Sequence, residues 1–97
     1  MEHADPDLSR LETDAQFRAG LAVPIVKQFR VVMQLIRTVP HRNALYQHRS
    51  RRLEKLEGKR QGQHSMRLNK KYRLIIEFIE ERSEEIARIV SVEKHYE

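Results

Sequence analysis

The hydrophobic period of the chain changes halfway along its length, from a helical repeat to the alternation of a strand. In the first half, apolar residues recur at spacings that place them on one side of a helix: Ile25, Phe29, Val32, Met33 and Ile36. From Tyr72 to Ile79, every even-numbered residue is apolar, which is typical of a strand with one buried face. Helices in the first half and strands in the second predict an α+β fold.

Two helices are predicted in the first half, and proline marks both ends of the longer one. Pro24 suits the first turn of this helix, and Pro40 ends it. A shorter helix is predicted over Leu8–Phe17, and Gly20 separates the two helices. The expected unit is a helix hairpin, followed by an irregular basic connection over residues 41–52.

Four strands joined by short turns are predicted in the second half, over residues 53–56, 63–68, 72–79 and 86–92. Asn69, Lys70 and Lys71 form a polar turn between the second and third strands. Such a succession favours an antiparallel meander, so we expect the helix hairpin to pack on one face of a small, mainly antiparallel sheet. Arg73 and Glu77 lie on the other face of the third strand, which we expect to be open to solvent or ligand.

The first seven residues do not look like a strand, because they contain a proline and three acids. We expect them to be disordered or atypical, which would leave the sheet one strand short or impair folding or activity. The 97 residues are otherwise expected to form a single domain.

The sequence lacks the features of membrane-spanning, secreted and disulfide-bonded proteins, and of proteins that bind nucleotides or metals. No run approaches 18 apolar residues, the acidic start does not resemble a signal peptide, and there is no cysteine. We therefore expect a cytoplasmic protein with no membrane contact. No glycine-rich phosphate loop is present, so no nucleotide cofactor is expected. His41 and His48 lie seven residues apart without the spacing of metal ligands, so no metal site is expected.

Basic charge is concentrated in one central block, residues 49–73. The chain has a net charge of +5, but this block alone carries +8, while residues 1–14 and 77–97 each carry −4. A dense basic block attracts polyanions, because binding releases the counterions condensed on their phosphates. The block fits a nucleic-acid interface, and equally a solvated surface.

Residues around this block have the types that RNA cleavage without a metal requires. Glu54 is a candidate base, His95 a candidate acid and Tyr96 an aromatic ring on which a nucleobase can stack. Arg67 and Arg73 lie on adjacent predicted strands and have the planar donors that stabilise a phosphorane. The same residues also fit surface ion pairs and an exposed terminus, and Arg73 could simply pair with Glu77.

The stretch from Leu53 to Leu74 reads LEKLEGKRQGQHSMRLNKKYRL. It resembles the signature of HigB-type toxins in the RelE/ParE superfamily, roughly L-x-x-L-x-G-x-R-x-G-Q-x-S-x-R-[LIV]-N-x-x-[WY]-R-[LI]. The resemblance extends over about residues 8–96. It implies a compact α+β fold, cleavage of messenger RNA in the ribosomal A site, and no cofactor. It also implies a cognate antitoxin, HigA-like and of the helix-turn-helix class, through which alone the toxin would reach operator DNA.

The resemblance assigns roles to individual positions. Glu54 matches the proposed general base, Arg73 the arginine on the transition-state phosphate, and His95 with Tyr96 the proposed acid and its stacking partner. The basic residues expected to contact RNA are Lys55, Lys59, Arg60, Arg67, Lys70 and Lys71. The order Lys94-His95-Tyr96-Glu97 departs from the Asp-Tyr-His ending of HigB relatives and is closer to the ending of YoeB-type toxins.

Two other functions are compatible with this pattern. The first is a gyrase inhibitor on the same fold, as in ParE-type toxins, although these typically lack the base and acid that Glu54 and His95 would supply. The second is an inactive relative that keeps antitoxin binding and operator control.

Overall fold

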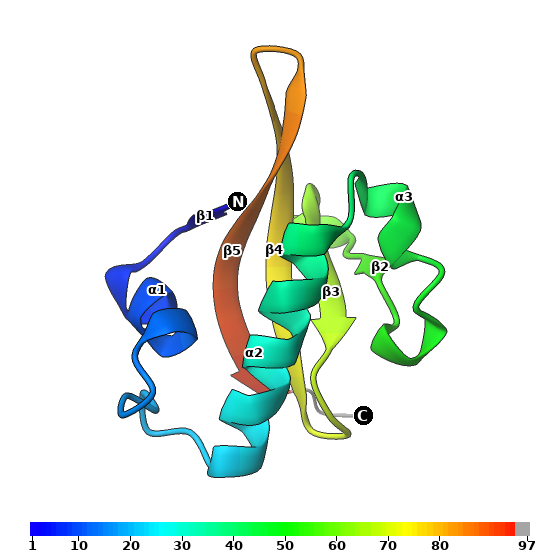
Figure 1. Ribbon diagram of the computed structural model, residues 1–97. Helices are drawn as coiled ribbons and strands as arrows, with labels where there is room; N and C mark the ends of the chain where they lie inside the picture. Colours follow the sequence, from blue (N-terminus) through cyan, green and yellow to red (C-terminus); the bar gives the residue numbers. More distant parts are fainter. Residues whose placement is uncertain (95–97) are drawn as a thin grey trace.

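The computed structural model describes residues 1–94, whose elements form a sheet with helices packed on it (Figure 1). The helices are α1 (Pro6–Thr13), α2 (Val23–Thr38) and α3 (Arg42–Leu45). The strands are β1 (Glu2–His3), β2 (Glu54–Lys55), β3 (Gln63–Arg67), β4 (Tyr72–Glu81) and β5 (Glu84–Lys94). The order across the sheet is β1-β5-β4-β3-β2, and every pair is antiparallel except β1 with β5. The prediction of an α+β fold with a mainly antiparallel sheet is confirmed.

The prediction that the first seven residues contain no strand is wrong. Glu2 and His3 form β1, which runs parallel to β5 opposite Arg88 and Ile89. Pro6 and two of the three acids, Asp5 and Asp7, belong instead to the start of α1, and the third acid, Glu2, lies within β1. Asp5 caps that helix by accepting a hydrogen bond from the backbone N–H of Asp7 at 2.7 Å, and Pro6 follows it.

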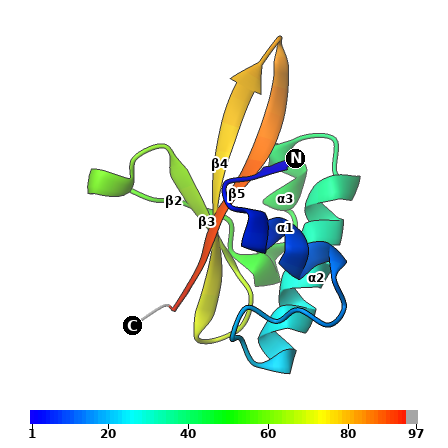
Figure 2. The same cartoon turned by 90° about the vertical axis from the view of Figure 1, so that its left-hand side faces the viewer.

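The helices lie on one side of the sheet, as Figure 2 shows with the strands seen nearly edge-on. The apolar stripe predicted for α2 is buried, with Pro24 in the first turn of the helix and Pro40 just beyond its end, as expected. The stripe packs in one core with Leu8 and Leu11 of α1 and with residues of the sheet and its β3–β4 turn, namely Met66, Leu68, Leu74, Ile76 and Ile89. No helix among residues 1–94 is long and apolar enough to cross a membrane.

Two local predictions in the helical half need correction. Helix α1 ends at Thr13 rather than near Phe17, because Asp14 leaves helical geometry and caps the last turn with its backbone N–H. The connection over residues 41–52 is not irregular throughout: it contains α3 and a 3-10 turn, η1 (Arg49–Arg51). His41 caps α3 by accepting a hydrogen bond from the Asn43 backbone N–H, at 3.2 Å.

Candidate active site

The sheet has an open face, opposite the helices, and the pairing of the strands brings charged residues together there. Arg67 of β3 lies opposite Arg73 of β4, which lies opposite Glu93 of β5. Glu54 of β2 lies opposite Ser65 of β3 in the neighbouring row. Paired residues point to the same face of a sheet, so these side chains share one surface.

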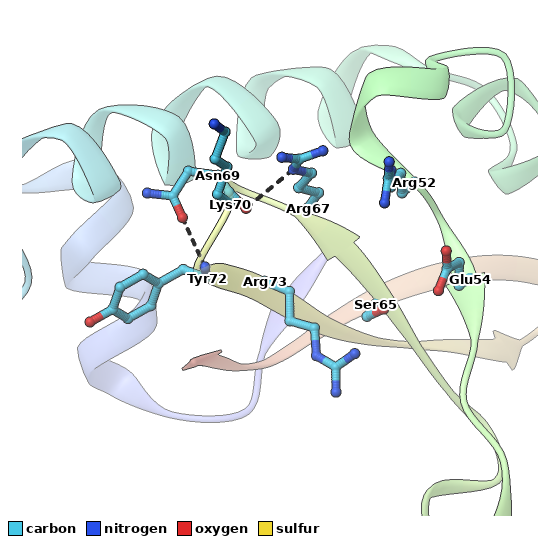
Figure 3. Close-up of a pocket in the computed structure, with 8 residues that line it drawn as sticks. All are labelled: Arg52, Glu54, Ser65, Arg67, Asn69, Lys70, Tyr72 and Arg73. Carbon is cyan, nitrogen blue, oxygen red and sulfur yellow. Dashed lines mark hydrogen bonds between the residues drawn. The ribbon is translucent and has the colours of Figure 1, made fainter. Parts of the chain in front are cut away.

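A cavity of about 70 Å³ opens on this face (Figure 3). The residues that line it are Arg52, Glu54, Ser65, Arg67, Asn69, Lys70, Tyr72 and Arg73. Four basic side chains therefore surround a single carboxylate, that of Glu54. A small cavity with this charge suits an anion the size of a phosphate group.

Arg73 has an unused donor at this cavity. Its Nε is buried and has no hydrogen-bond partner among the described residues. Glu77, the alternative partner considered from the sequence, instead accepts a hydrogen bond from Gln63 at 3.2 Å and lies 3.9 Å from Arg88. A buried donor without a partner costs stability, which is understandable where a ligand supplies the acceptor.

The turn between β3 and β4 holds Arg67 and Arg73 in place. Asn69 closes it, because its Oδ1 accepts hydrogen bonds from the backbone N–H groups of Lys71 and Tyr72, both at 2.8 Å. Such a side-chain bond to the backbone two residues on is the reason asparagine favours turns. The polar turn predicted from the sequence is thus confirmed.

Arg51 anchors this turn to the helices, and its role was not predicted. Its guanidinium donates to the backbone carbonyls of Arg67 and Leu68 at 3.3 and 3.4 Å. Another of its nitrogens donates to Gln28 Oε1 on α2, at 2.9 Å. Arg51 therefore fixes the position of the cavity relative to the helical layer.

Glu93 is a second carboxylate beside the cavity that sequence reasoning missed. It accepts hydrogen bonds from Arg60 at 2.5 Å and from the Ser91 hydroxyl at 2.8 Å. The hydrogen bond from Arg60 holds the pKa of Glu93 below its ordinary value against the opposing effect of burial, and Ser91 and the charge of Arg73 act in the same direction. Glu93 is therefore ionised near neutral pH and offsets part of the positive charge around Arg73.

The other predicted site residues are distributed unevenly. Glu54, Arg67, Lys70 and Arg73 meet in the cavity, and Arg60 adjoins it through Glu93. Lys55 is on the opposite face, since it pairs with His64, while Lys59 and Lys71 are exposed and do not line the cavity. His95 and Tyr96 lie outside the described residues. Within residues 1–94, no group of His, Asp and Glu is placed to hold a metal ion.

Comparison with known proteins identifies the family. A family model described as the RelE-like toxin of the type II toxin-antitoxin system HigB matches residues 1–93. The chain belongs to this family. It is thus a toxin of a type II toxin-antitoxin system, and the resemblance seen in residues 53–74 is confirmed.

The fold is also found among solved structures. The toxin is similar to a YoeB/ParE toxin from Agrobacterium tumefaciens, with a TM-score of 0.52 and 19% sequence identity, over 99% of this chain and 93% of that chain. At this identity the likeness shows the fold alone. No curated protein matches the sequence.

Proposed function

We propose that the toxin is a ribosome-dependent endoribonuclease that cleaves messenger RNA without a metal ion, and that the open-face cavity is its active site. The observation that carries the proposal is the buried Nε of Arg73, which has no hydrogen-bond partner within residues 1–94 and lies in a cavity that also presents Arg67 and Glu54. The family supports the proposal, because RelE-like toxins are generally ribonucleases. The cytoplasm is where such a toxin would meet translating ribosomes.

Each residue has a role in the proposed reaction. Glu54 accepts the proton of the 2′-hydroxyl, whose oxygen then attacks the adjacent phosphorus. Arg73 and Arg67 stabilise the extra negative charge on the phosphorane with fixed N–H donors. The bond to the 5′-oxygen breaks, and His95 is proposed to protonate this leaving group while Tyr96 stacks a base. The products carry a 2′,3′-cyclic phosphate and a 5′-hydroxyl.

The size of the cavity supports dependence on the ribosome. A volume of about 70 Å³ admits a phosphate group but leaves no enclosed space for the bases on either side. Lys70 and Arg52 also line the cavity, and their proposed role is to hold the flanking phosphates, which gives affinity without sequence selection. Alignment of the 2′-hydroxyl with the phosphate would then come from the ribosome, and cleavage of free RNA should be weak.

Mapping transcript ends in bacteria tests the proposal. Wild-type toxin, Arg73→Ala and the control Arg49→Ala, an exposed arginine outside the cavity, are each induced for minutes. We expect wild type and Arg49→Ala to produce new 5′-hydroxyl ends inside translated codons, and Arg73→Ala to produce none. Cuts with 5′-phosphate ends, or full activity in Arg73→Ala, would contradict the mechanism. Growth arrest without cuts, with inhibition of purified gyrase, would point to the ParE-type alternative.

A further inference from the structure

The outer surface of α2 carries an apolar groove far from the catalytic face. Val23 and Val31 are 57% and 46% exposed, two of three large hydrophobic side chains in residues 1–94 that are this exposed. They line a groove of about 550 Å³ together with Val26 and with Ala15 from the segment before the helix. The exposed valines thus give the groove an apolar lining that a partner can cover.

The charges around the groove all have the same sign. Arg18, Lys27 and Arg30 line it, and no carboxylate does. Arg30 is already occupied, since it donates to the backbone carbonyls of Leu11, Asp14 and Phe17 at 3.1, 2.9 and 3.3 Å. Arg18 and Lys27 are exposed and are not in any ion pair within residues 1–94. The groove therefore presents a positive rim around an apolar centre.

This combination discriminates among possible occupants. A second copy of the toxin docked by a two-fold axis would bring like charges against one another, which is unfavourable. A nucleic acid would match the positive rim but would leave the exposed valines without apolar contacts. An acidic amphipathic protein segment matches both, with apolar side chains on the valines and carboxylates on the rim.

We propose that this groove binds an acidic, amphipathic segment of the cognate antitoxin. The proposal rests on the family of the toxin and not on the RNA-cleaving activity. The buried stripe of α2 faces the sheet, and Figure 2 shows the helices on one side of the strands. The groove lies on this helical side, and the cavity lies on the open face of the sheet. A segment bound in the groove leaves Arg73 and Glu54 uncovered.

Binding of the purified cognate antitoxin, measured by calorimetry, tests the proposal. We expect Val31→Glu to weaken binding at least tenfold, and Val31→Lys to weaken it less, because a cation is compatible with an acidic partner. Lys27→Glu should weaken binding and reduce its dependence on salt. Both positions are exposed, so melting temperatures should match wild type.

The control is Arg73→Ala, which alters the opposite face and should bind antitoxin with wild-type affinity. The proposal is overturned if Val31→Glu and Lys27→Glu bind normally, whether or not Arg73→Ala binds poorly. It is also overturned if Val31→Glu changes only the oligomeric state of the toxin, since the groove would then join two toxins. Neither result depends on whether the toxin cleaves RNA.

Discussion

The two faces of the central sheet are built from the same strands, but one carries mainly apolar side chains and the other many charged ones. On the face toward the helices, Met66, Leu74, Ile76 and Ile89 are fully buried. The open face instead carries the charged residues of the cavity, among them Arg73, whose buried Nε has no partner in the described part of the chain. Because side chains alternate between the two faces along each strand, residues that stabilise the fold are next in sequence to residues proposed to act in cleavage.

Each face has one buried residue that is an exception to this division. His64 is 4% exposed among the apolar residues of the covered face, and neither ring nitrogen has a hydrogen-bond partner within the described residues. Ile75 is fully buried on the open face, between Ser65 and Ser91, and is not part of the main core. If the two faces are truly separable, substitutions on one should leave the property of the other unchanged.

The largest effect is expected on the covered face. Leu74→Ala should lower the free energy of unfolding by about 2–5 kcal/mol, because it removes a fully buried side chain and leaves a cavity. The cleavage rate per folded molecule should stay close to wild type. Urea denaturation gives the first quantity, and ribosome-dependent cleavage at low temperature gives the second. A large loss of activity in the folded fraction would show that the two faces are coupled.

Arg73→Ala, on the open face, should lower activity and leave stability nearly unchanged. Loss of one fixed donor to a transition-state oxyanion typically lowers the rate about 100- to 1000-fold. The free energy of unfolding should change little, since the buried Nε of Arg73 has no hydrogen bond to lose among the described residues. The lost attraction to Glu93 is offset by the loss of repulsion from Arg67, which lies opposite Arg73. Single-turnover cleavage on stalled ribosomes and urea denaturation measure the two effects. A variant that is equally active, or much less stable, would contradict the comparison.

Arg51 connects the two sides, so Arg51→Ala should change both properties moderately. It removes hydrogen bonds to the carbonyls of Arg67 and Leu68, which should cost about 1–3 kcal/mol of stability. Activity should fall because the turn that carries the cavity loses its anchor on α2. Arg49→Ala, two residues away and exposed, should change neither. Lost stability with unchanged activity would show that the turn keeps its geometry without this anchor.

The sequence predicted the parts of this arrangement that depend on local pattern. The prolines near the two ends of α2 and the asparagine of the β3–β4 turn predicted those elements. The alternation of side chains along β3 and β4 predicted that Arg67 and Arg73 share one face. Alternation also implies that Lys55, next to Glu54, points away from the cavity, as the structure shows, and its contact with RNA stays a prediction. Strand β1 was missed because two residues show no period, and their pairing with β5 is a long-range contact.

The position of Glu93 could not be predicted, because it depends on an irregularity in strand pairing. Between Ile75 and Ile76 the register shifts, so that Ile75 pairs with Ser91 while Ile76 pairs with Ile89, and Val90 is passed over. Without this bulge Arg73 would lie opposite Val92, and Glu93 would not be its neighbour. A one-residue shift is invisible in the hydrophobic pattern and decides which carboxylate lies beside the cavity.

The smallest effect is expected at His64, the exception on the covered face. Burial lowers the pKa of His64 from its ordinary value of 6.5, and the positive charges of Arg42 and Lys55 act in the same direction. The unfolded chain therefore binds a proton more readily than the folded protein. The contribution of neutral His64 to the free energy of unfolding is fully present above pH 6.5 and falls as the pH drops below this value.

His64→Leu should remove this part of the pH dependence and keep stability at pH 7.5 equal or higher, since two unpaired nitrogens disappear from a buried site. The informative quantity is the difference in unfolding free energy between variant and wild type from pH 7.5 to 5, in which the other histidines cancel. The carboxylates whose pKa values are lowered, Glu12, Asp14 and Glu93, lose their contribution only below about pH 4.5 and so do not interfere. A difference that stays flat across this range would mean that His64 is protonated as easily in the folded protein as in the unfolded chain. The covered face would then tolerate a charge, and the division between the two faces would be weaker than their side chains indicate.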